Sequence, residues 1–87
     1  MKTIEQMSHQ EQSFRCLYRA YLRAKLDKEN MIAMYQMSQD KLIKLLDEEY
    51  RKAMDEWQRN GATHDDVLMA IDEMNEYVNE EVRSGRI

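Results

Sequence analysis

The stretch that decides the fold is Asn30–Asn60, which reads NMIAMYQMSQDKLIKLLDEEYRKAMDEWQRN. It contains neither glycine nor proline, and its apolar residues recur every three or four positions, as they do on one face of a helix. These apolar residues are Met31, Met34, Tyr35, Leu42, Leu45, Leu46, Tyr50, Ala53, Met54 and Trp57. We therefore predict one long amphipathic helix over about residues 28–59, against which the rest of the chain packs.

The opposite face of this predicted helix carries acids placed four residues before bases. The pairs are Asp40 with Lys44, Asp47 with Arg51, Glu48 with Lys52, and Asp55 with Arg59. Each pair of this kind stabilises a helix by ~0.2–0.5 kcal/mol. We therefore expect the long helix to balance most of its own surface charge.

Two shorter helices are predicted on either side of the long one. The first covers about residues 4–25, and either Thr3 or Ser8 is suited to cap its N-terminus. The last covers about residues 64–83, because Thr63 follows an Asn-Gly turn and begins a capping-box pattern. Both helices carry an apolar stripe that can pack against the long helix.

The composition is that of a single all-α domain over residues 1–87. No proline and only two glycines leave little to punctuate strands, and 43% of the residues are apolar, which is too many for a disordered tail. We predict an antiparallel three-helix bundle built on the long central helix. One alternative stays open, because Ser38 interrupts the apolar stripe. A cap there would start a new helix at Gln39 and give four helices.

The sequence carries no pattern typical of a catalytic or metal site. Cys16 is the only cysteine and has no evident histidine base, while His9 and His64 each lack a second ligand at helical spacing. We expect no metal, no cofactor and no enzymatic activity, because three helices of this size can hardly enclose a pocket. No apolar run approaches the ~20 residues that span a bilayer, and no signal peptide is recognisable. We expect a soluble, cytoplasmic protein.

Charge is distributed unevenly along the chain. The net charge is −4, of which residues 1–44 carry +3 and residues 45–87 carry −7. The last predicted helix places many acids and an apolar methionine on its outward face, with few bases beside them. We predict that this surface binds a larger protein with a basic surface or cleft. Its residues are Asp65, Met69, Asp72, Glu73, Glu76 and Glu80.

A second candidate surface lies on the first predicted helix. Arg15, Arg19 and Arg23 recur every four residues and form a basic stripe beside the apolar face. Guanidinium groups bind phosphates, and Tyr18 or Tyr21 is able to stack on a base. The pI of about 5.1 opposes attraction to polyanions. A dimeric, nucleic-acid-associated regulator is therefore kept only as the alternative function. Because of the acidic pI, we favour a protein partner over nucleic acid.

The predicted helix lengths favour a homodimer. A helix over residues 28–59 is ~45 Å long, whereas its two neighbours reach only ~30 Å, so neither covers it. Apolar flanks at both ends would stay in water unless a second copy covered them. The expected dimer interface consists of Met31, Met34, Tyr35, Tyr50, Met54 and Trp57.

Together these features predict a small acidic helical protein that acts by binding. We expect it to bind a larger protein or assembly and to modulate it, in the first instance by inhibition. Accessory and inhibitor factors made by bacteriophages often share this size and composition, which makes a viral origin one hypothesis. That hypothesis rests on general character and not on a sequence motif.

Overall fold

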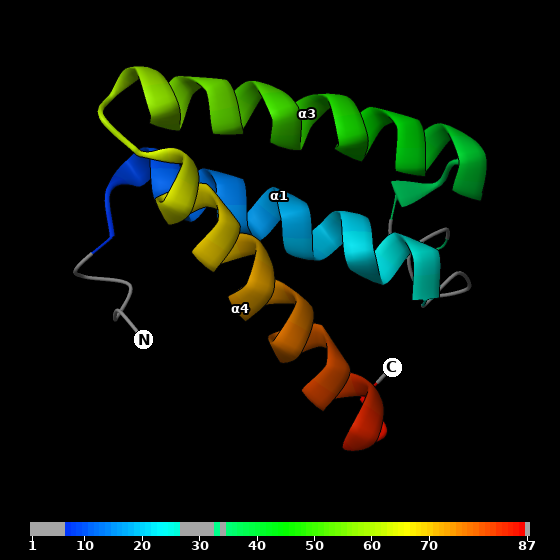
Figure 1. Ribbon diagram of the computed structural model, residues 1–87. Coiled ribbons are helices and arrows are strands. Elements are labelled where there is room, and N and C mark those ends of the chain that lie inside the picture. The colour runs from blue at the N-terminus through cyan, green and yellow to red at the C-terminus, as the bar shows by residue number, and fades with distance from the viewer. Residues whose placement is uncertain (1–6, 27–32, 34, 87) are drawn as a thin grey trace.

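The computed structural model describes residues 7–26, 33 and 35–86 of the 87-residue chain. Within these residues it contains three α-helices and no strand (Figure 1). The helices are α1 (His9–Leu26), α3 (Gln39–Arg59) and α4 (His64–Arg83). The predicted all-α fold class is confirmed.

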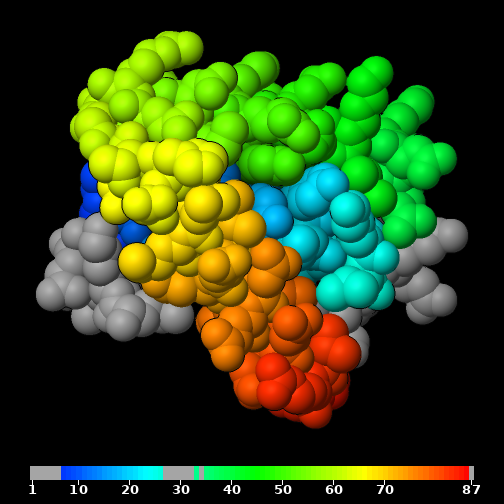
Figure 2. Space-filling view, viewed as in Figure 1, coloured from blue at the N-terminus to red at the C-terminus, as the bar shows by residue number. Residues whose placement is uncertain are grey.

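The helix with two neighbours is α1. It lies side by side with α3 and runs antiparallel to it, while α4 crosses α1 and diverges from α3 (Figure 1). Part of the α1 surface is visible between α3 and α4 in Figure 2. The prediction that the bundle is built on the Asn30–Asn60 stretch therefore needs correction, because α1 is the element that packs extensively against both of the others.

The long helix predicted over residues 28–59 is interrupted at Ser38. This residue has an extended backbone (φ −64°, ψ 153°), and its side chain accepts a hydrogen bond from the backbone N–H of Lys41, as an N-cap does. Just before it, Gln36 has a φ of 54°, which a helix does not accommodate. The alternative break near Ser38 is thus the correct one, and α3 begins at Gln39. Residues 27–32 and 34 lie outside the described residues, so a fourth helix there stays a prediction.

The start of α1 is set by Ser8. The Ser8 hydroxyl accepts a hydrogen bond from the backbone N–H of Glu11 at 3.1 Å, and α1 begins at His9. The prediction of a helix from about residue 4 is therefore wrong at residue 8, which has no helical conformation. The competing cap Thr3 lies outside the described residues.

The turn between α3 and α4 follows the prediction. Gly61 has a φ of 108°, a conformation that favours glycine, and it separates the two helices. The Thr63 side chain accepts from the Asp66 N–H at 3.1 Å, and the Asp66 carboxylate accepts from the Thr63 N–H at 2.9 Å. This reciprocal capping box fixes the start of α4.

The surface ion pairs of α3 agree with the predicted pattern in part. The Asp47 carboxylate accepts from Nε of Arg51 at 3.1 Å, as predicted. Nζ of Lys52 instead lies 3.5 Å from Oε1 of Glu49, which is three residues before it, and the predicted pair was with Glu48. Pairs this exposed contribute little, and the correction does not affect the fold.

The core is centred on aromatic stacking between α1 and α3. Phe14 is 0% exposed, and its ring centre lies 5.8 Å from those of both Trp57 and Tyr18. Val67 and Ala70 of α4 complete this cluster. A second cluster at the other end of the α1–α3 pair consists of Ala24, Leu42 and Leu46, with Met37 among the residues packed against it. Full burial of a large apolar side chain contributes ~1.5–3 kcal/mol, so these clusters hold α1 and α3 together.

Candidate interaction surface

The basic stripe of α1 faces α4. Nη1 of Arg15 donates to Oε2 of Glu73 at 2.9 Å, and Nε of the same arginine donates to Oε2 of Glu11 at 2.9 Å. Arg15 and Glu11 are both buried. The first arginine of the predicted basic patch is therefore an interior residue between two carboxylates.

The other two arginines meet on one buried carboxylate. Nε and Nη2 of Arg19 donate to the two oxygens of Glu81 at 3.0 and 3.2 Å, and Nη1 of Arg23 lies 3.8 Å from Oε2 of Glu81. Glu81 is only 3% exposed. The hydrogen bond from Arg19 lowers the pKa of Glu81, and the same bond raises the pKa of Arg19. The guanidinium of Arg19 also stacks 4.7 Å from the centre of the Tyr77 ring.

An exposed Arg15, Arg19 and Arg23 patch is therefore not what the fold presents. All three arginines are engaged by carboxylates of the same chain. Tyr18 and Tyr21 are partly buried and pack against the Tyr50 ring, with ring centres 5.1 and 5.0 Å away. The fold thus offers neither the free guanidinium groups nor the free tyrosine faces that the nucleic-acid hypothesis requires.

The acidic surface predicted on α4 is only partly correct. Glu73 faces Arg15, and Glu80 forms a 3.2 Å ion pair with Arg83 one turn further along. Asp65, Asp72 and Glu76 are exposed, and none of the three has a hydrogen bond or ion pair within the described part of the chain. The unpaired acids are thus three of the five that the sequence indicated.

Leu68 and Met69, two of the exposed large apolar side chains of α4, lie beside these unpaired acids. Met69 is 60% exposed, as its position between acids predicts, and Leu68 is 45% exposed. Helical spacing alone predicts that Leu68 lies at the edge of the buried apolar stripe of this helix. Leu68 lies outside the face of α4 that buries Val67 and Ala70, and sequence periodicity carries no signal for the angle at which α4 crosses α1 (Figure 1). Leu68 is therefore an addition to the predicted surface.

The residues of the predicted dimer interface do not form one exposed surface in the described part of the chain. Met31 and Met34 lie outside the described residues, and Tyr35 is exposed. The other three residues, Tyr50, Met54 and Trp57, belong to the core cluster or pack against it. Trp57 is 6% exposed within a single chain, so the uncovered flank predicted at that end of the long helix is absent.

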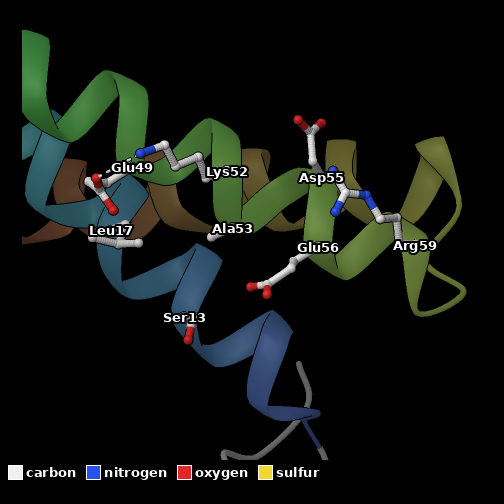
Figure 3. A pocket seen from close by; sticks show the side chains of 8 residues that line it. All are labelled: Ser13, Leu17, Glu49, Lys52, Ala53, Asp55, Glu56 and Arg59. Atoms are coloured by element: carbon white, nitrogen blue, oxygen red, sulfur yellow. Dashed lines mark hydrogen bonds and ion pairs between the residues drawn. The ribbon is translucent and has the colours of Figure 1, made fainter.

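A shallow groove of about 450 Å³ lies between α1 and α3 (Figure 3). Its walls carry charges of both signs, and Lys52 and Glu49 are already paired there. In Figure 3 the Glu56 carboxylate extends between the two helices above Ser13. The groove is open and no set of its groups converges on one point. Its lining consists of Ser13, Leu17, Glu49, Lys52, Ala53, Asp55, Glu56 and Arg59.

Other candidate chemistry is sparse in the described residues. Within them, no three His, Cys, Asp or Glu side chains are grouped closely enough to hold a metal ion. Cys16 is an exposed free thiol. No described helix combines the length and apolar character that crossing a membrane requires.

Comparison of the chain with protein-family models, with curated protein sequences and with solved structures finds no match. Functional inference therefore depends on the geometry of this chain alone.

Proposed function

We propose that the protein is a small helical interaction protein that binds a larger protein through the outer face of α4. The observation that carries this proposal is the combination of two exposed apolar side chains, Leu68 and Met69, with the unpaired acids Asp65, Asp72 and Glu76. We name these five residues the α4 outer face. Its partner presents a basic surface or cleft.

The two kinds of side chain support binding in different ways. Apolar area removed from water at the centre of an interface contributes ~25 cal/mol per Å² before the costs of association. Acidic groups around it attract a basic partner, accelerate encounter and disfavour acidic partners. A surface of this composition suits specific binding that weakens as salt is added.

The proposed consequence of binding is modulation of the partner, in the first instance inhibition by covering its basic surface. A viral accessory or inhibitor role remains one form of this proposal. We place the protein in the cytoplasm, because an exposed free thiol such as that of Cys16 persists most readily in a reducing compartment. The proposal involves no cofactor and no catalytic step.

Affinity capture from the native cell tests the proposal. The tagged chain, an α4 variant with Asp72→Lys and Glu76→Lys, and a matched control are used as baits, and bound proteins are identified by mass spectrometry. The control carries Glu48→Lys and Asp55→Lys, which make the same charge change at two exposed acids of α3. We expect one near-stoichiometric protein with the wild type and the control, and its loss with the α4 variant.

Circular dichroism on all three baits checks that each is folded. Retention of the partner by a folded α4 variant, or equal loss from the α4 variant and the α3 control, would contradict the assignment of the α4 outer face. Recovery of nucleic acid in place of a protein would contradict the proposed partner class.

A further inference from the structure

The attachment of α4 differs in kind from the packing of α1 against α3. Among the described elements α4 packs chiefly on α1, and it meets α3 only near Trp57, where Val67 and Ala70 join the aromatic cluster. Large aromatic side chains join α1 to α3, whereas the buried apolar side chains of α4 are mostly small. The latter are Val67, Ala70, Met74 and Val78.

Ion pairs supply the rest of this attachment. Glu73 and Glu81 of α4 meet the arginine stripe of α1, which consists of Arg15, Arg19 and Arg23. Buried charges cost several kcal/mol to desolvate and are tolerated only when well paired. The two glutamates therefore act as carboxylate ligands for the stripe. They are eight residues apart, or ~12 Å along a helix.

Residues 60–63 connect α3 to α4, and each of the two helices has its own cap. The end of α3 is capped at Asn60, and α4 has its own capping box at Thr63 and Asp66. Between them Gly61 has positive φ and no neighbouring atom within 4 Å of the position of a Cβ. Rotation about residues 60–63 keeps the hydrogen bonds within α3 and within α4. It disturbs only those that the backbone N–H groups of Gly61 and Ala62 donate to the carbonyls of Gln58 and Trp57 at the end of α3.

We infer that α4 is a hinged cover over the arginine stripe. It opens as a unit about residues 60–63 while α1 and α3 stay together. In the open state Arg15, Arg19 and Arg23 bind an acidic helical segment of a partner, whose carboxylates take the places of Glu73 and Glu81. This inference goes beyond the proposed function, because it uses the inner face of α4 and a partner of opposite charge.

Charge complementarity on the described surface identifies this occupant. The stripe already holds one acidic helix in the closed state, with carboxylates at the required spacing. A competing helix with two carboxylates eight residues apart reproduces the same contacts. An apolar ligand offers no carboxylate to replace Glu73 and Glu81, and the loss of these partners from largely buried guanidinium groups is strongly unfavourable.

Native-state hydrogen exchange of the unmodified protein in graded, sub-denaturing urea tests the hinge. We expect the amides of α4 to share one opening free energy that is lower, and less dependent on urea, than that of the slowest amides of α1 and α3, because a partial opening exposes less surface. A single common free energy and urea dependence for all three helices would overturn the hinged cover.

Peptide binding to the full chain tests the occupant. The probe is a synthetic peptide with the sequence of residues 64–83, and its matched control carries Glu73→Gln and Glu81→Gln. The full chain with Glu81→Gln has a weakened cover, so we expect it to bind the probe at least ~tenfold more tightly than the wild type does. The control peptide should lose most of that affinity.

A full chain with Glu48→Gln provides the second control, because Glu48 is an exposed acid of α3, outside the α4 outer face, with no hydrogen bond or ion pair in the described residues. It should bind the probe as the wild type does. Equal binding of the probe and the control peptide, or equal affinity of the Glu81→Gln chain and the wild type for the probe, would overturn the proposed anion-binding role of the stripe.

Discussion

At the scale of single residues, Glu81 is a buried carboxylate of α4 that two arginines of α1 share. It is buried, and it receives a bidentate hydrogen bond from Arg19 and a longer contact from Arg23. Removing the carboxylate leaves two guanidinium groups without their common partner. The stability of the protein is therefore linked to the ionisation of this one side chain.

The first prediction concerns pH. The folded state lowers the pKa of Glu81, chiefly through the hydrogen bond from Arg19, so the stabilising contribution is complete above the pKa of the unfolded chain and is lost as pH falls through the lower folded value. We expect the free energy of unfolding to fall more between pH 7 and pH 3 in the wild type than in Glu81→Gln. Urea unfolding at both pH values measures the difference, with Glu76→Gln as the control. Identical pH dependence of the wild type and Glu81→Gln would contradict this assignment.

The second prediction concerns the aromatic core. Phe14 is fully buried and stacks on both Trp57 and Tyr18, so Phe14→Ala removes contacts from two elements at once. We expect a loss of ~3–5 kcal/mol, a large part of the stability of a domain this small. Thermal unfolding by circular dichroism measures it. The exposed change Met69→Ala serves as the comparison and should cost less than ~0.5 kcal/mol.

At the scale of elements, Ser38 decides where α3 begins. The sequence identifies the break only as an alternative, because apolar residues continue at helical spacing on both sides of it. An N-cap contributes ~1 kcal/mol, which is comparable with the cost of interrupting a helix, so the pattern alone cannot choose. The positive φ of Gln36 has no signal in residue type, since glycine or asparagine is usual there.

The third prediction tests that cap. Ser38→Ala removes the side chain that accepts from the Lys41 N–H, and we expect the free energy of unfolding to fall by ~1 kcal/mol. Urea denaturation followed by circular dichroism measures the change. Ser13→Ala is a matched control inside α1, where alanine is a good helix former, and it should leave stability unchanged or slightly raised. A loss in the control as large as that in Ser38→Ala would remove the special role of the cap.

The packing of α4 against α1 shows which parts of the candidate site the sequence predicts and which it does not. The sequence indicates the arginine stripe and the acidic helix correctly as separate features, and Asp72, Glu76 and Met69 do lie on the surface. It does not indicate that Glu73 and Glu81 turn towards Arg15 and Arg19, because this depends on how α4 crosses α1. A clue existed in the opposite net charges of the two parts of the chain, since a surplus of each sign favours pairing between helices.

At the scale of the whole molecule, the three helices are nearly equal in length. The described helices α1, α3 and α4 contain 18, 21 and 20 residues, or ~27–32 Å, so none of these three extends far beyond the other two. The argument for a homodimer depended on such an overhang and on an uncovered Trp57. Trp57 is instead buried against α1 and α4 within one chain. Homodimerisation stays a prediction of the sequence, but the part of its physical reason that concerns Trp57 has been removed.

The last prediction follows from that removal. The exposed apolar side chains of Leu68 and Met69 on α4 are flanked by the acids Asp65, Asp72 and Glu76, and two copies meeting through this face would bring like charges together. We therefore expect a monomer of 10.5 kDa in sedimentation equilibrium at micromolar concentration, with no rise in mass as the sample is concentrated. A mass twice as large would restore the homodimer. If added salt, which screens like charges, raised the fraction of dimer, the α4 outer face would be the dimer interface and would be unavailable to the partner that we propose for it.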